Sequence, residues 1–186
     1  RIMENAMTKV PAHLGGHMFV THIDRGALRH LKQTLGVKTM LDIGCGPAGM
    51  QKIARELGIG WTGVDGDPSV AATGVITHDF ATGPCLGLES SYDLGWCVEV
   101  VEHVDERFLP NVMFAIRRCK AVVLTYAPPG WPGHHHVNCQ PERYWIEQMS
   151  TNGFQYDEPL TGVVRSSSEM VKSFMRDRGL VFRRKN

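Results

Sequence analysis

Several features that would place this chain in a special class are missing. No stretch approaches the roughly 18 consecutive apolar residues that a membrane-spanning helix needs. Residues 1–7 lack the apolar core of a signal peptide. The five cysteines are odd in number and form no Cys-x-x-Cys pair, which favours reduced intracellular thiols over a disulfide framework. We therefore expect a cytoplasmic protein with no membrane span.

An excess of charge of either sign is also absent. The 186 residues include 20 Lys and Arg against 19 Asp and Glu, a formal net charge of +1. This balance argues against a protein whose whole surface is built to bind nucleic acid. Residues 176–185 are basic and could contact phosphates, although such a run is more often a solvated edge strand. A nucleic acid partner is therefore not favoured.

Short apolar runs alternate along the chain with stretches of helical periodicity. Asp24 is a plausible N-cap for a helix with Leu28, Leu31 and Leu35 on one face, and Gly36 ends it. The alternation predicts an α/β fold in one domain, residues 1–186, with a mostly parallel sheet and helices on both faces. The other predicted helices span residues 51–57, 106–118, 141–150 and 168–176, and the predicted strands span residues 38–43, 61–64, 75–78, 92–98, 120–126, 154–157 and 180–184.

The loop after the first predicted strand carries a Gly-x-Gly-x-x-Gly pattern. Gly44 and Gly46 let the backbone approach a ligand closely, and Gly49 lets the next helix pack against the strand. A dinucleotide loop fits this pattern, with Asp65 as the acid about 20 residues further on. A loop that binds S-adenosylmethionine (SAM) fits it too. Asp42 favours SAM, because its carboxylate suits a cationic amino-acid end and would repel a pyrophosphate.

Four motifs in order resemble those of class I SAM-dependent methyltransferases. They are Asp42-x-Gly44-Cys45-Gly46, Val64-Asp65, His78-Asp79-Phe80, and the run Cys-Val-Glu-Val-Val-Glu-His-Val at residues 97–104. The resemblance covers about residues 39–154 and implies a Rossmann-like methyltransferase fold, with SAM as cofactor. It departs from the family after the second strand, where residues 68–72 leave room for only a turn or two. The cofactor-binding residues that it implies are Asp42, Gly44, Cys45, Gly46, Asp65, Gly66, Asp79, Phe80 and Cys97.

Three potential metal ligands follow the fourth predicted strand. Glu99, Glu102 and His103 would share one face of a helical turn. Two carboxylates and an imidazole suit a divalent cation such as Mg, Mn or Zn. The Glu-x-x-Glu-His run also resembles two metal-dependent branches of the family, the small-RNA 3′-terminal ribose 2′-O-methyltransferases and the ubiquinone-pathway catechol O-methyltransferases. One histidine of 134–136 could complete a metal set, which we write as Glu99, Glu102, His103 and His135.

The same side chains also suit chemistry without a metal. A histidine beside the acceptor could serve as general base, so Glu99, His103 and His135 are the candidate catalytic residues. We expect O-methylation of a small hydroxylated molecule, with RNA 3′-end ribose 2′-O-methylation as the alternative. The glycine pattern leaves an NAD-type oxidoreductase open. A non-catalytic SAM-binding protein is open as well, because binding is not turnover.

The N-terminal segment contains three closely spaced histidines, His13, His17 and His22. In proteins of this fold the N-terminal segment often covers the active site. We therefore expect residues 1–23 to form an N-terminal cap or a partly mobile segment. Trp131, Asn138 and Tyr144 flank the later histidines and could shape the acceptor pocket.

Overall fold

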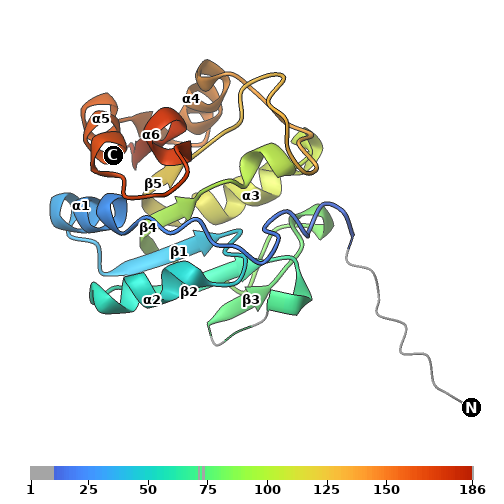
Figure 1. Cartoon of the computed structure of the whole chain (residues 1–186), viewed down its shortest axis with the longest axis horizontal. Helices are drawn as coiled ribbons and strands as arrows, with labels where there is room; N and C mark the ends of the chain where they lie inside the picture. The colour runs from blue at the N-terminus through green and yellow to red at the C-terminus, as the bar shows by residue number, and fades with distance from the viewer. Residues whose placement is uncertain (1–10, 71, 73, 186) are drawn as a thin grey trace, which may run out of the picture.

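One sheet of seven strands organises the protein. The computed structural model describes residues 11–70, 72 and 74–185. The strand order is β3-β2-β1-β4-β5-β7-β6 (Figure 1). The first five strands pair in parallel, whereas β7 runs antiparallel to both β5 and β6. The strands are β1 (Thr39–Ile43), β2 (Gly60–Asp65), β3 (Val75–Thr77), β4 (Tyr92–Cys97), β5 (Cys119–Leu124), β6 (Phe154–Tyr156) and β7 (Leu180–Arg184).

Helices cover both faces of the sheet. The apolar side chains of β5 alternate: Ala121 and Val123 pack with the cluster that contains α1, α2, α5 and α6, and Val122 and Leu124 pack with the cluster that contains α3 and α4. Among the described residues, no helix combines the length and the apolar character needed to cross a bilayer. The helices are α1 (Arg25–Leu35), α2 (Gly49–Glu56), α3 (Leu109–Ile116), α4 (Glu142–Thr151), α5 (Glu158–Ser167) and α6 (Phe174–Arg178).

All seven predicted strands are confirmed, each to within two residues at either end. After β2 the described residues form a short 3₁₀ turn, Pro68–Val70, as expected from the limited room there. The predicted helix over residues 168–176 is wrong over its first part. Helix α5 ends at Ser167, and α6 begins only at Phe174.

Asp24 explains that difference. It caps α1 by accepting a hydrogen bond from the Ala27 backbone N–H at 3.0 Å, as expected. The same carboxylate also accepts from the Ser168 hydroxyl and, at 2.9 Å, from the Glu169 backbone N–H. These bonds hold residues 168 and 169 in a loop against α1. A long-range contact therefore overrides the local helical pattern.

We expect Asp24→Ala to lower the free energy of unfolding by about 2–4 kcal/mol, because Asp24 is fully buried and three donors would lose their acceptor. Urea unfolding measures this loss. The matched control is Asp105→Ala, which removes a more exposed cap that accepts from the Arg107 backbone N–H and pairs with the Arg107 guanidinium at 3.4 Å. It should cost under about 1 kcal/mol. Equal losses in the two variants would contradict a bridging role for Asp24.

Candidate functional site

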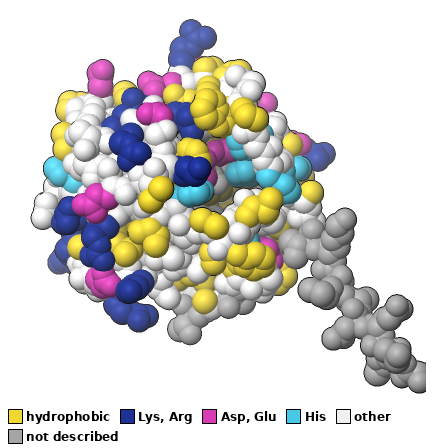
Figure 2. All heavy atoms as spheres, in the orientation of Figure 1, with side chains coloured by type: hydrophobic (Ala, Val, Ile, Leu, Met, Phe, Trp, Pro, Cys, Tyr) yellow, Lys and Arg dark blue, Asp and Glu magenta, His cyan; other side chains and the backbone are white. Residues whose placement is uncertain are grey.

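A cavity of about 640 Å³ lies beyond the carboxyl ends of β1, β2 and β4. Two segments border it besides the strand ends. One is the N-terminal strap, residues 11–23, which crosses the strand ends (Figure 1). The other is the histidine loop, residues 127–141, which follows β5. Figure 2 shows histidine side chains grouped around a hollow on this face. Ligands of open α/β sheets bind at this edge.

The loop between β1 and α2 turns sharply at two glycines. Gly44 and Gly46 have φ values of 68° and 50°, a region that favours glycine. A Cβ on Gly44 would lie 2.5 Å from Val100 Cγ2, so a larger residue has no space there. The Gly46 backbone N–H donates to Asp65 Oδ2 at 2.7 Å. The loop is thereby tied to the end of β2, and both sides of this tie line the cavity.

Asp42 presents a buried carboxyl group to the cavity. It is 3% exposed, and Trp61 Nε1 donates to its Oδ2 at 3.0 Å. Burial raises the pKa of Asp42 to about 7. The charge of Asp65 adds to this rise, whereas the Trp61 hydrogen bond opposes it. A cationic group in the cavity would compensate the buried charge.

The acids that follow β2 and β3 occupy different positions. Asp65 lines the cavity, whereas Asp67 is outside its lining and accepts from His17 Nε2 at 3.1 Å. Asp79 and Phe80 line the cavity as well. Asp79 Oδ1 accepts from the Ala81 backbone N–H at 2.8 Å.

Of the predicted cofactor residues, eight line the cavity and Cys97 does not. The side chain of Cys97 is fully buried in the core cluster on the α3 and α4 face. Cys97 is the last residue of β4, and its side chain points to the sheet face opposite that of Trp96. Its neighbours Trp96 and Val98 line the cavity instead. The eight are Asp42, Gly44, Cys45, Gly46, Asp65, Gly66, Asp79 and Phe80.

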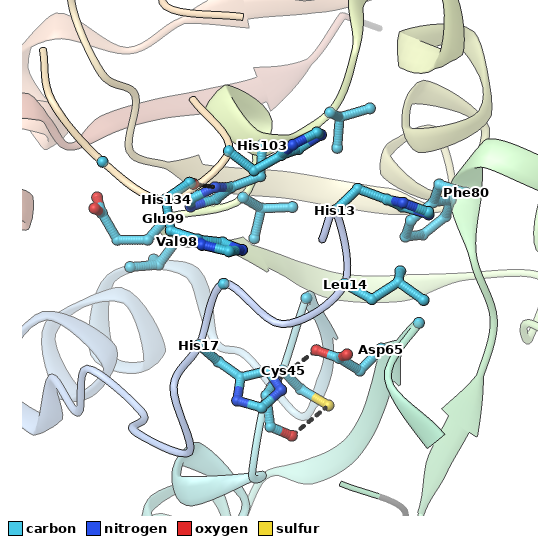
Figure 3. Close-up of a pocket in the computed structure, with 18 of the residues that line it drawn as sticks. His13, Leu14, His17, Cys45, Asp65, Phe80, Val98, Glu99, His103 and His134 are labelled. Atoms are coloured by element: carbon cyan, nitrogen blue, oxygen red, sulfur yellow. Dashed lines mark hydrogen bonds between the residues drawn. The ribbon is translucent and has the colours of Figure 1, made fainter. Parts of the chain in front are cut away.

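The N-terminal strap contacts many of these residues. His13 Nε2 donates to Asp79 Oδ2 at 2.8 Å, and Leu14 packs on Gly66 so closely that a Cβ there would lie 2.3 Å from Leu14 Cδ2. Figure 3 shows Leu14 directed toward Asp65 and Phe80, and His17 beside Cys45. Residues 11–23 therefore cover the glycine loop. Residues 1–10 of the expected cap lie outside the described residues.

Two potential metal ligands, His103 and His136, line the opposite end of the cavity, and a third, Glu102, is fully buried beside them outside its lining. One ligand atom from each of Glu102, His103 and His136 lies within 4.8 Å of the other two. His103 Nδ1 donates to the His134 carbonyl at 2.8 Å, and His136 Nδ1 donates to the Trp131 carbonyl at 3.0 Å. A carbonyl can only accept, so both imidazoles carry their proton on Nδ1 and leave Nε2 free when neutral.

Electrostatics of this group favour neutral imidazole and penalise free carboxylate. Burial lowers the pKa of His103 to about 4, and neighbouring His136 contributes. Burial, followed by the charge of Glu99, raises the pKa of Glu102 well above its ordinary value. Both oxygens of Glu102 are buried without a hydrogen-bond partner among the described residues. A cation would supply the missing partner.

The structure changes two members of the predicted metal set. His136 lies with Glu102 and His103, whereas His135 is turned toward the strap, with its ring centroid 6.2 Å from that of His13. Glu99 is outside the group, because Thr125 Oγ1 donates to its Oε1 at 2.7 Å. Figure 3 shows the Glu99 carboxylate turned away from His103. Backbone geometry separates these side chains: Glu99 has φ 57° and His135 has φ 47°.

Sequence reasoning missed two side chains near this end of the cavity. Phe174 lines it, and Arg178 stacks on the ring of Trp131, which also lines it. Both come from α6, more than 70 residues after the acid–histidine run. No local pattern signals that α6 packs there. The predicted pocket residue Trp131 does line the cavity, whereas Asn138 and Tyr144 lie outside its lining. Asn138 is buried, and the Tyr144 hydroxyl donates to Glu106 Oε1 at 2.6 Å.

No family model matches the sequence, and no curated protein matches it significantly. Solved structures do match the fold. Magnesium protoporphyrin IX methyltransferase from Synechocystis PCC 6803 with bound S-adenosylhomocysteine (SAH) has a TM-score of 0.58 and 16% identity, over 87% of this chain and 82% of that chain. The 1,6-didemethyltoxoflavin-N1-methyltransferase of Burkholderia thailandensis, with that compound and SAH bound, has a TM-score of 0.61 and 15% identity, over 86% and 77%. The methyltransferase domain of bacterial CtHen1 has a TM-score of 0.57 and 14% identity, over 87% and 97%.

The TM-scores establish a shared fold, although the sequence identities are low. The chain therefore has the Rossmann-like α/β fold of SAM-dependent methyltransferases, as the sequence motifs implied.

We expect Asp42→Asn to be more stable than the wild type at pH 8 and closer to it at pH 5. The raised pKa means that the folded chain binds more protons than the unfolded chain between about pH 4 and 7. Wild-type stability therefore falls as pH rises through this window, and the uncharged amide of the variant removes that loss. The stability difference between the two proteins should grow by about 2 kcal/mol from pH 5 to 8. Urea unfolding of ligand-free protein at each pH measures it.

The control for this pH profile is Asp93→Asn. Although burial acts to raise the pKa of Asp93, hydrogen bonds from Lys120, Lys38 and Thr39 hold it at about 2. Asp93 does not titrate between pH 5 and 8, so its variant should show a constant stability difference over that range. A constant difference for Asp42→Asn as well would contradict the raised pKa.

Proposed function

We propose that this chain is a SAM-dependent methyltransferase that methylates a hydroxyl group of a small molecule. The observation that carries the proposal is the arrangement of one cavity. The glycine loop, Asp42 and Asp65 line one end of the cavity. His103 and His136 line the other end, with Glu102 beside them. The first part suits the cofactor and the second suits a hydroxylated acceptor.

The residues on the cofactor side fit SAM in charge and in shape. Buried Asp42 is suited to the cationic amino end, since a positive charge there would offset the cost of its burial. Asp65 is placed to accept from ribose hydroxyls, and Phe80 offers a ring face beside Asp79 for the adenine. SAM supplies an activated methyl group on a sulfonium, so the protein mainly has to hold the acceptor in line.

The residues on the acceptor side fit a divalent metal ion. Glu102, His103 and His136 would hold it, and the unpartnered Glu102 oxygens support this assignment. The Nδ1 hydrogen bonds to backbone carbonyls are of the kind that orient metal-binding histidines. Such an ion would act as a Lewis acid that lowers the pKa of an acceptor hydroxyl. In the absence of a metal, neutral His103 would instead accept the hydroxyl proton on Nε2.

Two observations weigh against the other hypotheses. The antiparallel β7 between β5 and β6 differs from the dinucleotide-binding sheet of order 3-2-1-4-5-6. Two basic side chains of the C-terminal run are engaged away from the cavity: Arg183 pairs with Asp157 at 2.6 Å, and Lys185 donates to the Ser150 carbonyl at 3.0 Å. This weakens the case for an RNA acceptor, although RNA 3′ ends belong in any acceptor screen.

Calorimetry should detect SAH binding and little or no NAD binding. Asp65→Asn should weaken SAH binding about tenfold or more, because a carboxylate is lost from the cavity. Asp67→Asn is the matched control, since Asp67 does not line the cavity and should leave affinity within about twofold. Binding of NAD without SAH would favour an oxidoreductase. Binding of SAH with no methyl transfer from labelled SAM to catechols, hydroxy acids or RNA 3′ ends would favour a non-catalytic SAM-binding protein.

Metal content should distinguish His136 from His135. Untagged protein is equilibrated with Mn or Zn in the presence of SAH, freed of excess ion and assayed by elemental analysis. The wild type and His135→Ala should retain about one ion per chain, whereas His103→Ala and His136→Ala should lose it, since two ligands of three remain. A chelator should abolish methyl transfer. Loss of the ion in His135→Ala alone would overturn the assignment of His136.

A further inference from the structure

A second cavity lies beyond the opposite ends of the parallel strands. Its volume is about 760 Å³, and it is lined by residues at the amino ends of β1, β4 and β5, at the carboxyl end of β7 and at the end of α1. The first cavity lies beyond the carboxyl ends of β1, β2 and β4, so the length of the strands separates the two. The second cavity is therefore distinct from the site described above.

The charge around this second cavity is strongly one-sided. The chain as a whole has a formal net charge of only +1, yet five of its 20 Lys and Arg line this one hollow, together with a single carboxylate, Asp93. We call it the basic cavity. Its five cations are Lys38, Lys120, Arg183, Arg184 and Lys185.

The one carboxylate is already fully engaged. Asp93 Oδ1 accepts from Lys120 Nζ at 2.8 Å, and Oδ2 accepts from the backbone N–H groups of Lys38 and Thr39 at 2.9 Å and 3.1 Å. Although burial acts to raise the pKa of Asp93, these donors hold it at about 2. Asp93 is therefore charged, and it neutralises only one of the five cations.

Three of the five cations have no carboxylate partner. Arg183 pairs with Asp157 at 2.6 Å. Lys38, Arg184 and Lys185, in contrast, form no ion pair within residues 11–70, 72 and 74–185. The basic cavity thus keeps an excess of positive charge that this part of the chain does not balance.

Neutral groups hold two of these side chains in place. Arg184 donates twice to the Cys119 carbonyl, each time at 3.2 Å, and Lys185 donates to the Ser150 carbonyl at 3.0 Å. Neither contact cancels the charge. The ammonium of Lys38 has no hydrogen-bond partner among the described residues, so all three of its N–H groups are available to a ligand.

Protection of a sheet edge does not explain these cations. Charged side chains commonly guard an edge strand against pairing with another chain, and the basic run at residues 176–185 suggested such a strand. Strand β7 instead pairs with β5 on one side and with β6 on the other, so it is not an edge strand. The cations at its end require another explanation.

We propose that the basic cavity binds a small molecule that carries a diphosphate group. The proposal goes beyond the proposed function and does not depend on it. Several cations around one hollow suit an anion with several charges, because a single negative charge would leave most of them unbalanced. The volume is in the range of small-molecule sites, whereas a nucleic acid strand would follow a longer basic track.

Calorimetry with inorganic diphosphate tests the proposal on the full chain, freed of divalent ions. At about 0.15 M salt the wild type should bind one diphosphate per chain, and bind it more tightly than orthophosphate. Lys38→Met should weaken this binding about fivefold, because a charge-assisted hydrogen bond to the ligand is lost. Lys38 is exposed and its side chain has no described partner, so the variant should keep the Tm of the ligand-free wild type.

The matched control is Lys52→Met. Lys52 is an exposed lysine on α2, outside the lining of both cavities. Its variant should bind diphosphate as the wild type does, which separates a specific site from general attraction by positive charge. Saturating SAH should leave the affinity for diphosphate within about twofold, because the two cavities are separate.

Chemical labelling locates the ligand independently of affinity. Lysine amines are acetylated with and without diphosphate, and the modified positions are identified by mass spectrometry. Diphosphate should lower the labelling of Lys38 and Lys185 severalfold and leave that of Lys52 unchanged.

Four results would overturn the proposal. They are no binding of diphosphate by the wild type, equal affinity in Lys38→Met and the wild type, equal losses in Lys38→Met and Lys52→Met, and displacement of diphosphate by SAH. Tighter binding of single-stranded oligonucleotides, with an affinity that rises with their length, would make this surface a nucleic acid site instead. Failure of SAH to bind would reject the proposed function and leave the diphosphate result unaffected.

Discussion

The site depends on the parallel alignment of the first five strands. Because β1, β2, β3, β4 and β5 run in the same direction, every segment that leaves these strands starts at one edge of the sheet. The glycine loop, the acids after β2 and β3, the acid–histidine run after β4 and the histidine loop after β5 therefore meet around one cavity. This constraint brings residues that are as far apart in the chain as Asp42 and His136 to the same cavity.

Burial of charge gives that cavity its chemical character. Asp42, Glu99 and Glu102 are carboxyl groups whose pKa values burial raises, and Arg178 is a buried cation without a hydrogen-bond partner among the described residues. Each arrangement costs stability in the absence of a ligand. A cationic cofactor end and a divalent ion would each offset one part of that cost.

Features set by local sequence were predicted correctly, whereas a feature set by a long-range contact was not. The strands and the glycine loop were predicted well, because apolar runs, turn residues and the carboxylate before the glycines are written within a few neighbouring positions. The helix predicted over residues 168–176 was wrong in its first part, because Ser168 and Glu169 bind Asp24 from the other end of the chain. The side chain of the predicted cofactor residue Cys97 lies in the core, because strand alternation turns it away from the face on which Trp96 and Val98 line the cavity.

The sequence by itself determined the α/β architecture, the glycine loop and the set of acids and histidines available at one sheet edge. Each of these follows from patterns of short range in the chain. Only the tertiary structure decided which members meet: His136 joins Glu102 and His103 while His135 turns to the strap, and Phe174 reaches the cavity from α6. Those choices depend on backbone angles at single residues and on packing between distant helices, and neither leaves a local pattern in the sequence.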